Sequence, residues 1–222
     1  SLMSLTAVSE SVGIELNSLG ALVSAEESTR RRRIVDATVG LVVERGVRSL
    51  SLEEVASRAG ISRATLYRWF PGGREELFDA ALATEVARFF SSLSAELSRA
   101  NSAEETCVEF LVEAARRLDP ESALAMLLAE RTGTFGAAVT FEGLQSALEI
   151  GSDFLWPFYA RQMEPDAAGR AAELTVRVGL SYLFGPDGEL HLSDRSDVEA
   201  LVARHVAPSL EALSAQRANE GR

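Results

Sequence analysis

The sequence predicts an all-α fold of about nine helices, because of its low proline content and the positions of its apolar residues. Hydrophobic residues make up 46% of the 222 residues, which is enough for a sizeable core, and only six residues are proline. Apolar residues recur at helical spacing over long stretches, and glycines cluster at the breaks between these stretches. Helices explain this pattern better than many short strands do.

Charge is distributed unevenly along the chain. The net charge of −11 would by itself argue against a nucleic-acid partner. Residues 30–77, however, carry ten arginines against six acidic residues, whereas residues 78–222 carry 12 arginines against 23 acidic residues. No basic residue is a lysine, so phosphate contacts would come from guanidinium groups, hydroxyls or the backbone. The basic excess is confined to one N-terminal segment.

A helix-turn-helix pattern lies inside this basic segment. We expect a first helix from about Arg30 to Gly46. Ser51 and Glu54 then form a capping box at the start of a second helix. Gly60 ends that helix as a residue able to adopt positive φ at the turn. The spacing indicates a helix-turn-helix whose next helix enters the major groove of DNA.

The next helix is capped by Ser62, ends near Phe70 and exposes groups that suit DNA. An arginine can pair with guanine in a bidentate manner, small apolar groups can contact a thymine methyl, and hydroxyls can bond phosphates. The residues with this chemistry are Arg63 for guanine, Ala64 and Thr65 for thymine, and Ser62 and Tyr67 for phosphate.

The second and third helices carry a family resemblance. Residues 51–71 read Ser-Leu-Glu-Glu-Val-Ala-Ser-Arg-Ala-Gly-Ile-Ser-Arg-Ala-Thr-Leu-Tyr-Arg-Trp-Phe-Pro, and Arg-Glu-Glu-Leu follows. Over about residues 30–78 the chain closely resembles the DNA-binding domain of the tetracycline-repressor (TetR) family. The resemblance implies a bacterial transcription factor, a repressor in preference to an activator. The DNA contacts that it implies are Ser51, Ser62, Arg63, Ala64, Thr65 and Tyr67.

Other residues of this segment are further candidates for DNA contact. The arginine run at the start of the first helix could bind phosphates or the minor groove, or form a solvated helix end. Trp69 could face DNA or pack against the first helix. These further candidates are Arg30, Arg31, Arg32, Arg33, Arg68 and Trp69.

The chain departs from the family pattern after Phe70. A Phe-Pro-Ser-Lys-Glu run is usual there, whereas this chain reads Phe-Pro-Gly-Gly-Arg-Glu and is one residue longer. Either Arg74 replaces the lysine as a phosphate contact, or Gly72 and Gly73 present their amides to phosphate at the start of the fourth helix.

We expect three parts in the chain: residues 1–28 as an N-terminal extension, 29–74 as the DNA-binding domain, and 75–222 as a helical ligand-binding and dimerisation domain. Ser1 and Leu2, ahead of Met3, are interpreted as a cloning remnant, and the rest of the extension as a disordered leader or an extra helix. Six helices are expected in the last part, at about 75–99, 102–118, 121–132, 137–162, 167–184 and 196–215. A kink or split is expected at Pro157 and at Pro208.

The resemblance also implies a buried ligand pocket in the last part, lined by aromatic side chains and a few polar groups. Residues 181–185 and 192–194 resemble, more weakly, a regulatory domain of actinobacterial members that include regulators of quorum-signal degradation. That would imply an apolar effector such as a lactone or an acyl compound. The candidates are Phe90, Phe110, Glu130, Arg131, Phe135, Phe154, Phe158, Arg161, Arg177 and Tyr182, for each of which a core or surface role is the alternative.

A second copy of the chain is the other expected partner. A helix-turn-helix usually reads two half-sites about one turn of DNA apart, so a homodimer on a pseudo-palindromic operator is expected. The apolar stripe of the last two helices would form the interface, or be buried within the chain. The interface candidates are Leu174, Val178, Tyr182, Leu201, Val202, His205, Leu210 and Leu213.

Few features favour an enzyme. The single cysteine, Cys107, has no activating neighbour, and His191 and His205 are the only histidines. No phosphate-binding loop, metal-ligand cluster or nucleophile elbow is recognisable, so no cofactor or metal is expected. Unpaired cysteine, no leader sequence and no membrane span favour a cytoplasmic protein. The rival that remains is a DNA-binding regulator whose C-terminal part only dimerises or binds a protein partner.

Overall fold

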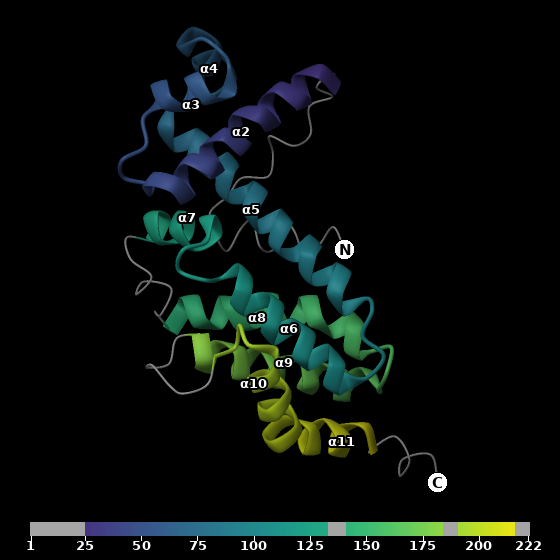
Figure 1. Ribbon diagram of the computed structural model, residues 1–222. Helices are drawn as coiled ribbons and strands as arrows, with labels where there is room; N and C mark the ends of the chain where they lie inside the picture. The colour runs from purple at the N-terminus through teal and green to yellow at the C-terminus, as the bar shows by residue number, and fades with distance from the viewer. Residues whose placement is uncertain (1–24, 133–140, 184–190, 216–222) are drawn as a thin grey trace. The chain divides into compact units, whose positions relative to one another are not determined.

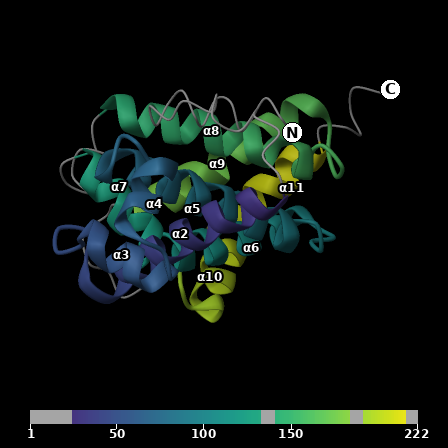
Figure 2. The same cartoon turned by 90° about the horizontal axis from the view of Figure 1, so that it is seen from above.

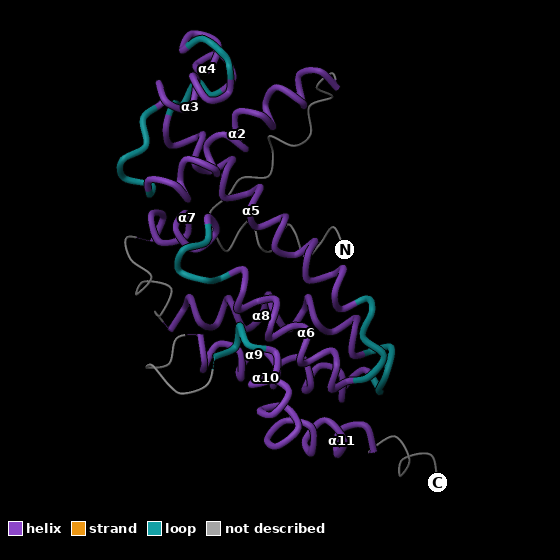
Figure 3. The backbone as a smooth tube through the Cα atoms, viewed as in Figure 1, coloured by secondary structure: helices purple, strands orange, loops and turns teal. Residues whose placement is uncertain are grey.

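The computed structural model describes residues 25–132, 141–183 and 191–215 (Figure 1). Throughout these ranges the regular structure is helical, and short loops join the helices (Figure 3). With the interrupted last helix counted once, these ranges contain nine helices, so the predicted all-α class is confirmed. No helix in them is long and apolar enough to span a membrane.

The described residues form two compact units. The N-terminal unit contains residues 25–88 and 119–132, and the C-terminal unit contains 89–118, 141–183 and 191–215. Helix α5 (Arg74–Leu97) contributes its first part to the N-terminal unit and its last part to the C-terminal unit. Helix α7 (Ala123–Thr132) is grouped with the N-terminal unit, where it packs against α2.

The N-terminal unit contains the helix-turn-helix. Helix α2 (Ala25–Arg45) begins five residues before the predicted start and packs against α3 (Leu52–Ala59), which contacts α4 (Arg63–Trp69). Apolar residues at helical spacing fill the core of this unit, whereas Leu52 and Ile61, which we also expected to face inward, are only partly buried. The buried ones are Ile34, Ala37, Leu41, Val42, Val55, Ala56, Ala59, Leu66 and Phe70.

The turn between α3 and α4 depends on Gly60. Its φ of 69° lies in the left-handed region, which costs a residue with a Cβ atom about 1–2 kcal/mol. There its N–H donates to the Ser57 carbonyl at 3.1 Å, and the N–H of Ile61 donates to the Ala56 carbonyl at 3.0 Å. These bonds satisfy the last carbonyls of α3 and set the direction in which α4 begins.

The C-terminal unit is a helical bundle. Its helices are α6 (Ala103–Arg117), α8 (Phe141–Tyr159), α9 (Pro165–Leu183), α10 (Arg195–Leu201) and α11 (Ala207–Ala215). Helices α8 and α9 lie side by side (Figures 1 and 2). Gly151 permits this approach, because a Cβ atom there would lie 2.9 Å from Cγ2 of Val176.

The prolines take different positions in the helices. Pro165 lies between the helices expected at 137–162 and 167–184, and it is the first residue of α9, where its missing N–H costs nothing. Helix α8 continues through Pro157. Immediately before Pro208, residues Val202–Val206 form a π-helical turn, and the N–H of Ala207 donates to the Val202 carbonyl. This turn fits the expected local split, because Pro208 cannot donate to the carbonyl four residues earlier.

Candidate functional site

Ser51 sits at the exposed start of α3, and the predicted capping box is confirmed. The Ser51 hydroxyl oxygen accepts a bond from the Glu54 N–H at 3.2 Å, and the Ser51 N–H donates to Glu54 Oε2 at 3.2 Å. The bonds from the backbone and hydroxyl of Ser51 lower the pKa of Glu54, so this carboxylate stays ionised. The cap fixes Ser51 at the surface.

Ser62 caps α4 in the same way. Its hydroxyl oxygen accepts a bond from the Thr65 N–H at 3.1 Å, and the two hydroxyls lie 2.9 Å apart. Leu66 is fully buried, whereas Tyr67 remains 39% exposed. Because Leu66 holds α4 to the core, the exposed side chains of the helix stay available to a partner. They are Arg63, Ala64, Tyr67 and Arg68.

Arg63 has two neighbours on the surface. Its Nη1 lies 2.6 Å from Oε1 of Glu53, and its Cζ lies 5.7 Å from the centroid of the Tyr67 ring. The Arg63 side chain is still 58% exposed. The bond to Glu53 shows that the first turns of α3 and α4 are within side-chain reach. Glu53 was not among the residues predicted from the sequence, because its partner lies ten positions away on another helix.

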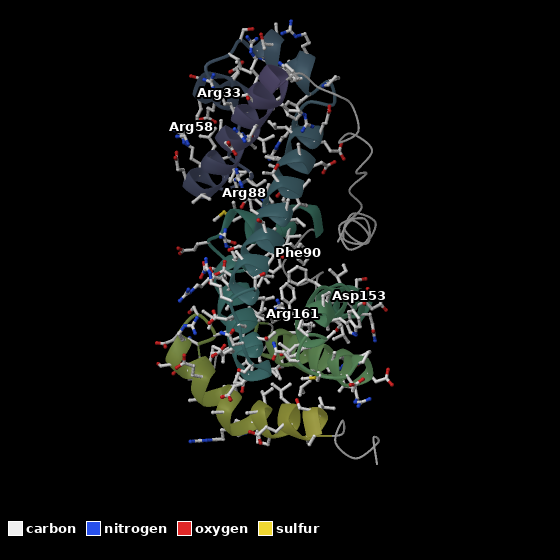
Figure 4. The ribbon with its side chains drawn as sticks, turned by 90° about the vertical axis from the view of Figure 1, so that its right-hand side faces the viewer. Arg33, Arg58, Arg88, Phe90, Asp153 and Arg161 are labelled. Carbon is white, nitrogen blue, oxygen red and sulfur yellow. The ribbon has the colours of Figure 1, made fainter. Side chains whose placement is uncertain are left out.

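The arginine run on α2 is divided between structural contacts and surface. The Arg31 guanidinium lies over the Phe70 ring at 4.9 Å, and Arg33 donates from Nη2 to the Ala59 carbonyl at 3.3 Å. Through this bond Arg33, labelled in Figure 4, meets the negative end of the α3 dipole. Arg30, Arg32 and Arg33 are exposed, and Arg31 is partly buried. Two of the four arginines therefore support the helix-turn-helix itself.

Arg74 and the two glycines before it also have partners within the chain. The Arg74 guanidinium donates to the Val47 carbonyl at 2.8 Å and lies over the Phe78 ring at 4.8 Å. The Gly72 N–H donates to Oε2 of Glu76 at 2.8 Å, and the N–H of Gly73 donates to the Phe70 carbonyl at 2.9 Å. Any phosphate bound here would compete with these bonds or add to them.

Trp69 and Arg68 differ in exposure. Trp69 is partly buried, and its buried Nε1 has no hydrogen-bond partner in the part of the chain that the structure describes. Arg68 is exposed, and it forms no ion pair within that same part. Arg68 is the better placed of the two to meet a phosphate.

Further ion pairs join the helices of this unit, and two of their arginines, Arg58 and Arg88, are labelled in Figure 4. Arg58 of α3 forms two bonds of 2.7 Å with Glu44 of α2, which lower the pKa of Glu44. Arg88 of α5 pairs with Asp36 of α2 and with Glu85. Exposed pairs of this kind add little stability.

Four phenylalanines of the C-terminal unit form an aromatic cluster, defined as Phe89, Phe90, Phe154 and Phe158. Ring centroids lie 5.1 Å apart for Phe89 and Phe90, 4.8 Å for Phe90 and Phe154, and 5.6 Å for Phe154 and Phe158. Arg161 lies over Phe158 at 5.1 Å and donates to the Leu97 carbonyl at 3.2 Å. The structure thus brings together four predicted ligand contacts: Phe90, Phe154, Phe158 and Arg161 (labelled in Figure 4 for Phe90 and Arg161).

Polar side chains in the same unit are mostly satisfied. Gln162 donates from Nε2 to the Thr106 hydroxyl at 3.0 Å, but its buried Oε1 has no partner within the described ranges. The hydroxyls of Tyr159 and Thr175 are 2.7 Å apart. Next to them is the buried Cys107 thiol, whose pKa burial raises to about 11. Such a thiol is unreactive, as expected for a core residue.

The other predicted ligand contacts lie apart from the aromatic cluster. Phe110 is buried in the core. Glu130 belongs to the N-terminal unit, where its carboxylate lies 3.9 Å from Arg74. Arg177 pairs with Glu173 on an exposed helix face, and Tyr182 is 43% exposed. Phe135 and the side chain of Arg131 lie outside what the structure describes.

The predicted interface residues fall into two groups. Leu201, Val202 and Leu210 are at most 5% exposed, because they fill the core of the chain itself and leave no side-chain surface for a second copy. The others are partly or fully exposed: Leu174, Val178, Tyr182, His205 and Leu213. Leu174, Val178 and Tyr182 are four residues apart, so they share one face of α9.

Comparison with known proteins agrees with this geometry. The model of the family "Bacterial regulatory proteins, tetR family" matches residues 34–81, which contain the whole helix-turn-helix. An HTH-type transcriptional regulator of Mycobacterium tuberculosis, itself uncharacterized, is 26% identical over 196 residues, which are 85% of this chain and 89% of that protein. The DNA-binding domain belongs to the TetR family.

Other transcriptional regulators are similar over different lengths. The repressor KstR of Rhodococcus jostii is 40% identical over 70 residues, or 32% of each chain. The crystal structure of the TetR-family repressor AlkX of Dietzia sp. superposes with a TM-score of 0.50 at 22% identity, over 82% of this chain and 95% of that one. The curated relatives are transcriptional regulators, and this chain, which carries a TetR-type DNA-binding domain, is a DNA-binding transcriptional regulator of the helix-turn-helix type.

Proposed function

We propose that this regulator is a homodimeric repressor that binds a pseudo-palindromic operator and leaves it when a small apolar effector binds the C-terminal unit. The observation that carries the proposal is the exposed start of α4. There Ser62 caps the helix, Leu66 anchors it, and Arg63 and Tyr67 stay at the surface. A rigid, exposed first turn is what a recognition helix needs to reach base edges.

The contacts divide by chemistry. Arg63 would read guanine, and Ala64 with the Thr65 methyl group would contact thymine. The hydroxyls of Ser51, Ser62 and Tyr67, together with Arg32 and Arg68, would bind phosphates and set the register on the duplex. Arg31, Arg33 and Arg74 would act mainly by holding the domain together, because each contacts another helix or loop.

A dimer would supply a second DNA-binding domain for the other half-site. Its proposed interface is the α9 stripe of Leu174, Val178 and Tyr182, together with Leu213 of α11, since these apolar residues remain partly exposed on the single chain. A two-fold interface of this kind repeats the same contacts in both subunits. The two identical DNA-binding domains would then match the two halves of a palindromic site.

The aromatic cluster is the proposed effector site. Rings on α5 and α8 offer apolar surface, Arg161 offers donors at one end, and the buried Oε1 of Gln162 would accept one hydrogen bond. An apolar molecule that carries a single hydroxyl or amide donor fits this set. The name of the relative KstR, a repressor, supports repression as the direction of control.

The test begins with the full-length protein and a random double-stranded DNA library. Repeated selection should enrich a palindromic sequence, and size-exclusion chromatography with light scattering should give a dimer. A panel of acyl compounds and lactones should then contain one that raises the melting temperature and releases the selected duplex. A monomer, or a library that yields no common sequence, would refute the proposal. Binding without any releasing compound would favour a partner-binding C-terminal unit.

A further inference from the structure

The ion pair between Glu53 and Arg63 joins the first turns of α3 and α4 within the proposed DNA interface. We propose that Glu53 determines specificity: its carboxylate orients the Arg63 guanidinium for guanine and weakens binding to sites that lack guanine at that position. The inference rests on the proposed DNA contact of Arg63. It assigns a function to an acidic residue on a surface that should attract DNA.

Arg63 is held from two directions. Oε1 of Glu53 accepts a bond from Nη1 at 2.6 Å, and the Tyr67 ring lies 5.7 Å from Cζ. A guanidinium has five N–H donors, so after the bond to Glu53 enough remain for the O6 and N7 atoms of a guanine. A guanidinium that is already oriented loses less conformational entropy when it binds, so the gain from a correct base pair is larger.

Glu53 takes no part in the capping of α3, unlike its neighbour Glu54. The capping box uses Glu54, which accepts bonds from Ser51 and also pairs with Arg45. The Glu53 side chain is 70% exposed, and Arg63 is the partner that its carboxylate meets. The fold of α3 therefore does not require a carboxylate at this position.

The charge of Glu53 would also act on the DNA backbone. Ser51, a proposed phosphate contact, stands two residues before it, so a phosphate bound there would be close to the carboxylate. Repulsion between them lowers the affinity for every sequence. This loss is common to all sites, so the difference between correct and incorrect sites comes from the orientation of Arg63, which favours guanine alone. The two effects together leave sites without guanine with the lowest affinity.

The chain contains a matched control. Glu44 and Arg58 form an equally short exposed pair, with two bonds of 2.7 Å, but they join α2 to α3 and neither residue lies on α4. Glu44→Gln and Glu53→Gln remove the same charge and keep the same side-chain size. A general effect of charge would appear in both variants, whereas an effect on base preference should appear only in Glu53→Gln.

The experiment uses the full-length wild-type protein and the duplex that it selects from a random library. Arg63→Ala first identifies the base pair that Arg63 reads, as the position whose guanine preference disappears. In Glu53→Gln the guanine preference at that base pair should fall by about fivefold or more. Affinity for a duplex of unrelated sequence should rise, and Glu44→Gln should keep the wild-type preference. Circular dichroism melting verifies that each variant is folded.

An unchanged guanine preference in Glu53→Gln, or an equal loss in Glu44→Gln, would overturn the proposal. Glu53→Ala gives a second reading, because alanine cannot replace the hydrogen bond that glutamine can still accept. The guanine preference of Glu53→Ala should fall at least as far as that of Glu53→Gln. If the wild-type protein selects no sequence, the proposed function fails. If it selects one and both Glu53 variants keep it, only this inference fails.

Discussion

Arg33 of α2 donates a hydrogen bond from Nη2 to the carbonyl of Ala59, the last residue of α3. This bond lies beside Gly60, whose positive φ forms the turn of the helix-turn-helix. A cation at a helix C-terminus meets free carbonyl groups and the negative end of the helix dipole. The arginine run before the first core residue therefore contributes to the fold as well as to charge.

Arg33→Ala should lower the free energy of unfolding by about 1 kcal/mol, because the Ala59 carbonyl loses its donor. Arg32→Ala should leave the melting temperature unchanged, since Arg32 is exposed and pairs with no other described residue. It should instead reduce the slope of the salt dependence of DNA binding by about one for each phosphate that the arginine neutralises. Melting curves and titrations at several salt concentrations distinguish the two effects. Equal losses of stability in Arg33→Ala and Arg32→Ala would contradict the assignment of a structural role to Arg33 and of a DNA-binding role to Arg32.

Much of the helix-turn-helix could be predicted from the sequence, because its signals are local. The caps at Ser51 and Ser62 and the turn at Gly60 each depend on residues within four positions. The partners of Arg33 and Arg74 could not be predicted, since they lie 26 and 27 residues away on other helices or loops. Helix crossing, set by core packing, determines those contacts.

The C-terminal unit could be predicted less well for the same reason. Period alone cannot tell whether an apolar stripe packs inside the chain or against a second copy. Leu201, Val202 and Leu210 continue the stripe, yet they are buried in the core of the chain. The aromatic cluster likewise combines residues of α5 and α8, which are more than sixty positions apart in the case of Phe90 and Phe154.

Two glycines in helices should respond oppositely to alanine. In Gly151→Ala the new Cβ would lie 2.9 Å from Val176, so α8 and α9 must separate and the protein should lose about 1–3 kcal/mol. In Gly169→Ala the nearest atom is Cδ1 of Trp156 at 4.0 Å, so the better helix propensity of alanine should stabilise by about 0.5–1 kcal/mol. Urea unfolding curves measure both changes. Stabilisation by Gly151→Ala would disprove the close crossing.

The buried Cys107 thiol should make stability depend on alkaline pH. Its pKa rises from 9.0 to about 11 on folding, so the folded state favours the protonated thiol. That contribution, on the order of 2–3 kcal/mol, is present below pH 9.0 and is lost as the pH rises through about 11. Cys107→Ala should therefore lose less stability than the wild type over this interval. Parallel pH profiles for the two proteins would contradict the expectation, as would rapid alkylation of the folded protein.

Ser62 combines a helix cap with a proposed phosphate contact, and two substitutions separate these roles. Ser62→Ala removes the acceptor of the Thr65 N–H, so it should cost about 1 kcal/mol of stability and also weaken DNA binding. Ser62→Asp keeps a good cap and adds a negative charge at the start of α4, so stability should stay near that of the wild type. Its affinity for the selected duplex should fall further than that of Ser62→Ala, because the carboxylate repels the phosphate that the hydroxyl would bind. Melting curves and binding titrations on the same samples measure both. If Ser62→Asp bound DNA as tightly as the wild type, the phosphate would not lie at the start of α4, and the orientation of this helix on the duplex would have to be revised.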